Sequence, residues 1–133
     1  MYEYHGWATI QEASYFIEEE EHIDEIIEEI KEYIHELNWR QGDLQIRAVN
    51  GEFHLLVSGF SNHNYEEPYL LNLYRFIASK APGSYGLLYI RDGTDVNGKN
   101  NIFRVIVLAR GNISEQSDPF LSPCVPVIED EVR

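Results

Sequence analysis

Histidine and glutamate recur in this sequence at a spacing that can hold a metal ion. Glu19 with His22 and Glu32 with His35 both show the Glu-x-x-His spacing of di-iron carboxylate helical bundles. Those sites draw ligands from four long helices, whereas this sequence predicts two. A glutamate-rich helix also produces the spacing by chance, so we favour a solvated helix face and expect no metal site and no cofactor.

A second set of residues could support nucleophilic catalysis. Ser58 and His63 lie five positions apart at the end of an apolar run that also contains His54. No Gly-x-Ser-x-Gly turn and no acid partner accompanies the serine. The single cysteine, Cys124, has no basic neighbours, which is typical of a buried thiol. We therefore predict no catalytic residue. A small enzyme or adaptor using the His54, Ser58 and His63 region remains the alternative.

The stretch from Glu18 to Leu37 carries most of the charge of the chain. It contains ten acidic residues and one lysine, and so accounts for nine of the thirteen net negative charges. Isoleucines at helical spacing predict one buried stripe along it. The opposite face carries six acids: Glu21, Asp24, Glu25, Glu28, Glu32 and Glu36.

Acids four residues apart on this helix repel one another, which costs on the order of 1–3 kcal/mol in total. Helix stability therefore does not explain the face, whereas solubility or a basic partner does. We predict that these six residues bind a partner protein with a basic surface. Two polar loops supply secondary partner-binding candidates: Asn62, His63, Asp92 and Asp95.

The net charge of −13 argues against nucleic acid or an anionic membrane as a partner, because both are polyanions. No apolar run approaches the ~20 residues that a membrane span needs. The N-terminus shows no signal peptide, and one cysteine excludes an internal disulfide. We expect a cytoplasmic protein with a single domain over residues 1–133. The sequence leaves its oligomeric state open.

Alternating and helical patterns predict an α+β fold in the order β-α-β-β-α-β-β. The expected strands are 2–12, 44–49, 53–60, 85–91 and 102–110, and the expected helices are 18–37 and 64–80. Right-handed crossovers favour a mainly antiparallel five-stranded sheet in ferredoxin-like order, 4-1-3-2 with strand five outside strand four. Two helices then cover one face of the sheet.

Residues 1–112 form this expected core, and residues 113–133 form an extended tail punctuated by prolines. The fourth and fifth strands are apolar on both faces, so the face away from the helices needs a cover. The tail, with Phe120, Leu121, Val125 and Val127, is the cover that we predict. A dimer or a partner protein is the alternative.

Several blocks follow one another along nearly the whole chain. Besides the acidic stretch, the blocks are Tyr4 to Trp7, Val57 to Phe60 with Asn62-His63, Ala81 to Tyr89, Asp118 to Cys124 and Ile128 to Asp130. In this order they resemble the immunity protein 7 family. The resemblance implies a cytoplasmic α+β protein encoded beside a toxin of a bacterial polymorphic toxin system. It implies binding and blocking of that cognate toxin domain, and it carries over no catalytic residue.

The resemblance and the charge together suggest how the toxin is blocked. A toxin domain that acts on nucleic acid presents a basic cleft, which an acidic helix can fill as a polyanion mimic. This favours a nuclease as the toxin. A deaminase, a peptidase or another toxin fits the family equally, and occlusion beside the active site is equally open.

Overall fold

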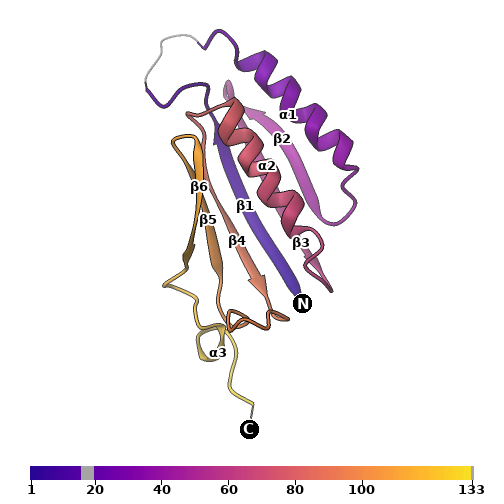
Figure 1. The fold of residues 1–133 in the computed structure, drawn as a ribbon, viewed down its shortest axis with the longest axis vertical. Coiled ribbons are helices and arrows are strands. Elements are labelled where there is room, and N and C mark those ends of the chain that lie inside the picture. The colour runs from indigo at the N-terminus through magenta and orange to yellow at the C-terminus, as the bar shows by residue number, and fades with distance from the viewer. Residues whose placement is uncertain (16–19, 133) are drawn as a thin grey trace.

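The computed structural model describes residues 1–15 and 20–132. Glu18 and Glu19, which begin the expected acidic helix and one of the two Glu-x-x-His spacings, lie outside the described residues. The described chain runs through β1 (Tyr2–Ile10), α1 (Ile23–Leu37), β2 (Asp43–Val49), β3 (Glu52–Ser61), α2 (Glu67–Lys80), β4 (Tyr85–Asp92), β5 (Arg104–Ala109), β6 (Asn112–Ser117) and α3 (Cys124–Val127) (Figure 1).

The strands form one sheet in the order β2-β3-β1-β4-β5-β6, and each pair of neighbours is antiparallel. The five expected strands occupy their expected places in the ferredoxin-like order. Each long helix connects two strands that lie two places apart, so that β3 fits between β1 and β2, and β1 fits between β3 and β4. The α+β class is confirmed, but the expected strand number is not.

The sheet has a sixth strand where we expected an extended tail, so the five-stranded prediction was wrong. Arg110 and Gly111 make the tight turn from β5 to β6 with positive φ angles of 52° and 78°, as a two-residue hairpin turn requires. The strand is polar except for Ile113, which packs against the core opposite Leu108. β6 forms because it satisfies the backbone donors and acceptors along the edge of β5.

The hydrophobic core lies between the two long helices and one face of the sheet, as expected (Figure 1). α1 contributes Ile27 and Ile30 at 1% and 0% exposure, and half-buried isoleucines flank them. The helical spacing of these isoleucines gives α1 its buried stripe, and each fully buried side chain stabilises the fold by about 1.5–3 kcal/mol. From α2, the buried residues are Leu70, Leu73, Tyr74, Ile77 and Ala78.

Two glycines allow close approaches between β4 and the N-terminal segment. A Cβ atom on Gly83 would lie 1.9 Å from the Ala13 carbonyl oxygen, and one on Gly86 would lie 2.1 Å from the Trp7 carbonyl oxygen. No side chain fits at either position, and the obstructing atoms are backbone that must move to make room. The Ala-Pro-Gly-Ser-Tyr-Gly block is therefore explained by packing.

The segment after β6 folds against the start of β5 rather than across the second face of the sheet. The Phe103 N–H donates to the Ser122 hydroxyl at 2.8 Å, and the Cys124 N–H donates to the Asn101 carbonyl at 2.8 Å. Cys124 is buried there, whereas Phe120 is 80% exposed. The prediction that this segment covers the second face of the sheet was therefore wrong for most of that face.

Candidate functional site

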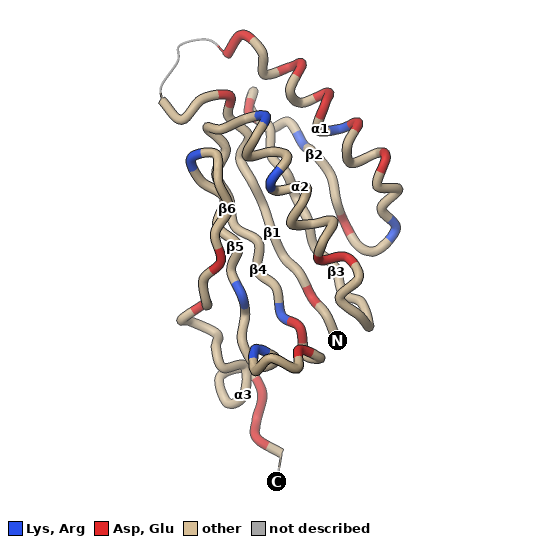
Figure 2. The backbone as a smooth tube through the Cα atoms, viewed as in Figure 1, with Lys and Arg blue, Asp and Glu red and all other residues tan. Residues whose placement is uncertain are grey.

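The acidic face of α1 is the surface on which the sequence places the partner. It consists of Glu21, just before the first turn, and five residues of the helix: Asp24, Glu25, Glu28, Glu32 and Glu36. All six side chains are exposed, because the isoleucine stripe turns the opposite side of the helix to the core. Figure 2 shows acidic positions repeating along the whole length of α1.

Few basic groups of the chain neutralise the acidic face of α1. Lys31 Nζ lies 3.6 Å from Glu28 Oε1, and His22 Nδ1 lies 4.0 Å from Glu25 Oε2. Both pairs are exposed, and such pairs contribute little to stability. The other four acids form no ion pair with any described residue. The repulsion that the sequence predicts along this face is therefore relieved only slightly within the chain.

The two loops proposed as secondary contacts lie side by side. The Asn64 amide donates to Asp92 Oδ2 at 3.0 Å, which joins the end of β3 to the end of β4. Asn62 and His63 are exposed, and His63 stacks on Tyr65 with ring centroids 5.1 Å apart.

The two acids of these loops are less accessible. Asp95 is half-buried, and Asp92 is only 4% exposed. The Thr94 hydroxyl and N–H donate to Asp92 Oδ1 at 2.7 and 3.0 Å. Burial alone would raise the pKa of the Asp92 carboxyl, but hydrogen bonds from Thr94 and Asn64 hold this pKa below its usual value. Asp92 is therefore a buried acceptor that holds the two loops in place, and little of it is accessible to a partner.

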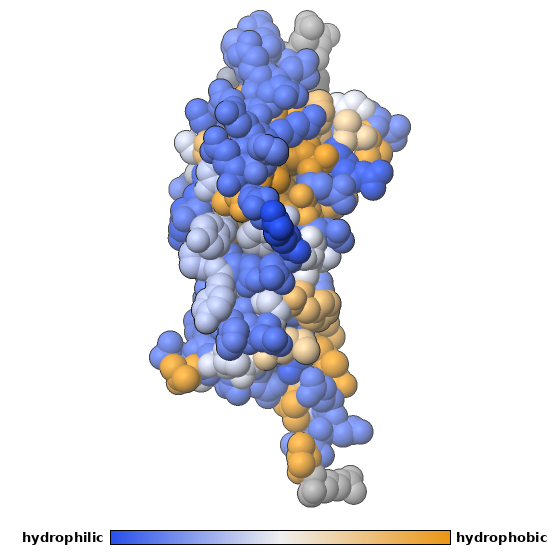
Figure 3. All heavy atoms as spheres, turned by 90° about the vertical axis from the view of Figure 1, so that its right-hand side faces the viewer, coloured by the Kyte–Doolittle hydropathy of each residue, from blue (hydrophilic) through white to orange (hydrophobic). Residues whose placement is uncertain are grey.

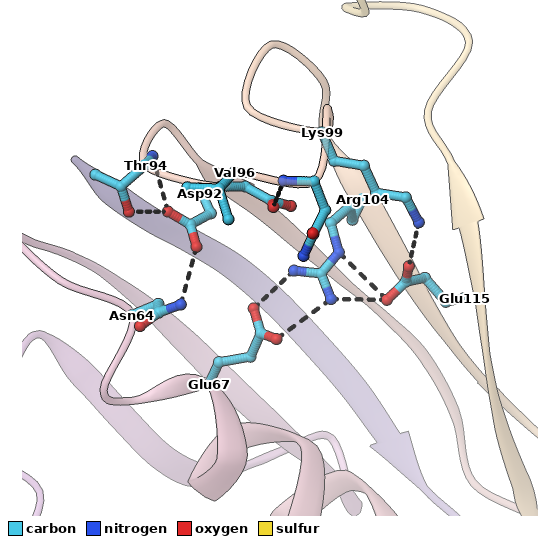
Figure 4. A pocket seen from close by; sticks show the side chains of 10 residues that line it. Asn64, Glu67, Asp92, Thr94, Val96, Lys99, Arg104 and Glu115 are labelled. Atoms are coloured by element: carbon cyan, nitrogen blue, oxygen red, sulfur yellow. Dashed lines mark hydrogen bonds and ion pairs between the residues drawn. The ribbon is translucent and has the colours of Figure 1, made fainter.

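Beside Asp92 lies a charged cluster that the sequence analysis missed (Figure 4). The Arg104 guanidinium donates two hydrogen bonds to Glu67, at 2.7 and 3.3 Å, and another to Glu115 Oε1 at 2.7 Å. Lys99 Nζ approaches Glu115 Oε2 at 3.3 Å. The cluster thus joins α2, β5 and β6, and a cavity of about 410 Å³ opens beside it.

The charges of this cluster satisfy one another. Burial would lower the pKa of the Arg104 guanidinium, but its bonds to Glu67 and Glu115 raise this pKa above its usual value. The hydrogen bond from Arg104, more than any other cause, lowers the pKa of the Glu115 carboxyl. Groups paired in this way hold the fold together, and we assign the cluster a structural role.

The residues of the alternative catalytic set do not come together. His54 and Ser58 point from β3 to the same face of the sheet, but four residues of a strand separate them by about 13 Å. The His54 ring instead contacts the Thr9 hydroxyl at 3.2 Å, and His63 stacks on Tyr65 in the loop beyond the strand. Among the described residues, no three or more His, Cys, Asp or Glu side chains gather as a metal site would require.

The face of the sheet away from the helices is here called the open sheet face. Its exposed hydrophobic side chains include Trp7 of β1, Leu56 and Phe60 of β3, and Tyr85 of β4. A groove of about 510 Å³ runs across it, with Trp7, Leu56 and Tyr89 among the lining residues. Figure 3 looks at the molecule from the side on which α1 lies and not onto this face, and it shows hydrophobic side chains next to hydrophilic ones.

Comparison with known proteins gives one finding. The family model described as immunity protein 7 matches residues 1–130. No curated protein and no solved structure matches the chain. No helix among the described residues is long and apolar enough to cross a membrane.

Proposed function

Because the chain belongs to the immunity protein 7 family, we propose that it binds the toxin domain encoded beside its own gene and neutralises it stoichiometrically. The observation that carries this proposal is the family match, which extends over residues 1–130 of 133. An immunity protein protects the cell that makes a toxin by binding that toxin. The partner is therefore a cognate domain of a polymorphic toxin.

The acidic face of α1 is the contact surface in this proposal. Its six acids are exposed and largely unneutralised, on a chain whose net charge is −13. A basic toxin surface relieves the repulsion along the helix when it binds, and the opposite charges speed the encounter. A nuclease fits best, because an enzyme that acts on nucleic acid carries basic groups around its substrate cleft.

Inhibition proceeds by occlusion and needs no reaction. The histidines and the serine that could act as catalysts lie apart and have structural neighbours, as at His54 and His63. The bound helix excludes the toxin's substrate by occupying the same basic groups. One copy of the chain then blocks one toxin domain for as long as the complex lasts.

Co-expression tests this proposal. The toxin in this test is the C-terminal domain of the large secreted protein encoded by the neighbouring gene. Cells that express the toxin domain alone should stop growing, and the chain should restore growth and co-purify with the domain. A toxin domain from an unrelated system serves as the control and should remain toxic. A folded chain that neither restores growth nor co-purifies with its neighbour's domain contradicts the proposal.

A further inference from the structure

The groove on the open sheet face has the composition of a protein-binding centre. Trp7 is 38% exposed and Phe60 is 58% exposed, although the chain has a well-formed core in which large side chains could be buried. Tryptophan and tyrosine dominate the binding energy at the centres of protein interfaces, where charged residues are depleted. Asp43 is the only formally charged residue among the described residues that line the groove.

Strand register places these side chains in neighbouring rows. Trp7 lies directly between Leu56 of β3 and Leu87 of β4, and the next row holds His5 between Ser58 and Tyr89. Side chains opposite one another across antiparallel strands are about 5 Å apart and make one continuous surface. The groove therefore crosses β3, β1 and β4 and reaches the edge strand β2.

Neighbouring rings hold the aromatic side chains in place. Trp7 meets Tyr85 edge to face with ring centroids 5.9 Å apart, and His5 meets Phe60 in the same way at 5.5 Å. A side chain that is already fixed loses little entropy when a partner binds. These rings are thus preorganised anchors.

No described segment of the chain covers the groove. The C-terminal segment reaches only one end of this face, where Glu129 pairs with Arg91 at 3.1 Å. A second copy of the chain is a poor occupant, because it would bring a second net charge of −13 against the first. The charge favours a basic partner, and Asp43 in the groove can receive a cationic side chain.

We propose that the open sheet face anchors the toxin domain through an apolar patch that carries an arginine or a lysine. This inference rests on the proposed function. Arginine suits the groove best, because its guanidinium can either pair with Asp43 of β2 or stack on an aromatic face such as that of Trp7 of β1. The toxin thus contributes a basic surface for α1 and an arginine with apolar neighbours for the groove.

One toxin domain can reach both surfaces around the β2 edge. β2 is the edge strand of the sheet. Asp43 and Gln45 line the groove on one side of it, whereas Leu44 and Ile46 pack with the core on the other, helix-covered side. Successive residues of a strand point to opposite faces, so the edge is only one strand thick. Because the acidic face of α1 points away from the sheet, a domain that contacts both surfaces extends around the β2 edge and past the flank of α1.

The two surfaces then differ in what they control. Charges on α1 act at a distance and set the association rate, which depends on salt. Aromatic anchors act only in contact and set the dissociation rate. Variants of the two surfaces should therefore differ in which rate they change.

The test uses Trp7→Ala and Phe60→Ser, with Tyr69→Ser as the matched control. Tyr69 is 55% exposed but lies on α2, away from the open sheet face. The probe is the purified C-terminal domain of the neighbouring secreted protein. Each open-face variant should dissociate from it about 30-fold faster or more, with an unchanged dependence of association on salt. Tyr69→Ser should dissociate like the wild type.

The negative results of this experiment are distinguishable from one another. Wild-type protein that does not bind the domain overturns the proposed function and this inference together. Wild-type protein that binds, with both variants dissociating within about 3-fold of it, overturns this inference alone. A wild-type dimer without toxin that Phe60→Ser converts to monomer also overturns it, because a second copy then occupies the face. Thermal unfolding checks that each variant is folded. If Trp7→Ala does not fold, the result for Phe60→Ser decides, because Phe60 is highly exposed and its replacement leaves the core intact.

Discussion

Reversal of three charges on the acidic face of α1 should leave the helix intact. The variant replaces Glu25, Glu28 and Glu32 with lysine. Four of the five repulsive pairs that these positions make four residues apart become attractive, and the contact of 3.6 Å between Glu28 and Lys31 is lost. Each reversed pair loses a repulsion and gains an attraction of about 0.2–0.5 kcal/mol each, so α1 becomes more stable by about 1–3 kcal/mol. Any loss of binding then has a cause other than unfolding.

The same change should slow association with the toxin. It brings the formal net charge from −13 to about −7 and removes half of the acids from the face. Electrostatic steering accelerates association by about 10–10³-fold, so the variant should associate at least about tenfold more slowly at low salt. Its rate should also fall less steeply as salt is added.

Stopped-flow mixing with the toxin domain across a range of salt concentrations measures both effects. The control replaces Asp130 and Glu131 with lysine, which brings the net charge to about −9 in a region away from α1 and leaves the pair between Glu129 and Arg91 in place. The control should slow association less than the α1 variant does. Equal rates and equal salt slopes for the wild type and the α1 variant would refute the assignment of the contact to α1. Equal slowing by the control would show that only net charge matters.

Three further predictions concern the fold. Arg104→Met should lower the free energy of unfolding in urea by about 1–3 kcal/mol, because the half-buried Glu67 loses its partner and the exposed Glu115 keeps only Lys99; a loss under about 1 kcal/mol would contradict this. Because hydrogen bonds lower the pKa of Asp92 in the folded chain, its stabilisation is complete at neutral pH and is lost in acid, as the pH falls from the ordinary pKa of an aspartate through the lowered one. In Asp92→Asn, the urea midpoint of unfolding should therefore depend less on pH in acid than it does in the wild type. The same pH dependence in both proteins would contradict this role of Asp92. Gly83→Ala should destabilise the fold by about 1–3 kcal/mol, because the new Cβ clashes with the Ala13 backbone. The control is Gly93→Ala, whose Cβ would lie 3.3 Å from the Met1 carbonyl oxygen and which should change the melting temperature little. Equal melting temperatures for the two variants would exclude the clash.

The fold was readable from the sequence as far as its hydrophobic periodicity extended. The isoleucines of α1 and the alternating residues of β1 and β3 predicted elements that the structure contains. β6 was missed because Asn112 to Ser117 holds one apolar residue and shows no alternation. Such an edge strand is defined by what lies beside it, since β5 offers unpaired backbone groups. The clue in the sequence was Gly111, which follows an apolar strand directly.

The candidate site divides in the same way. The helical period predicted that six acids share one exposed face, because that property depends only on local spacing. The cluster around Arg104 joins residues 37 and 11 positions away in sequence, and no pattern links residues so distant. An arginine inside the apolar run from Phe103 to Leu108 was the available signal, since a charge in such a place needs partners. The sequence predicted an apolar second face of the sheet, because two strands carry apolar residues on both sides. It did not predict the path of the C-terminal segment, which leaves that face open.

The measurement that tests the central claim most directly is a titration of the toxin domain with this protein. The toxin's own activity is followed while the chain is added in steps, at concentrations well above the dissociation constant. Stoichiometric occlusion predicts a linear loss of activity that reaches zero at one equivalent and does not change with time of incubation. Toxin activity that persists above one equivalent, or that disappears progressively with a small fraction of an equivalent, would contradict the claim.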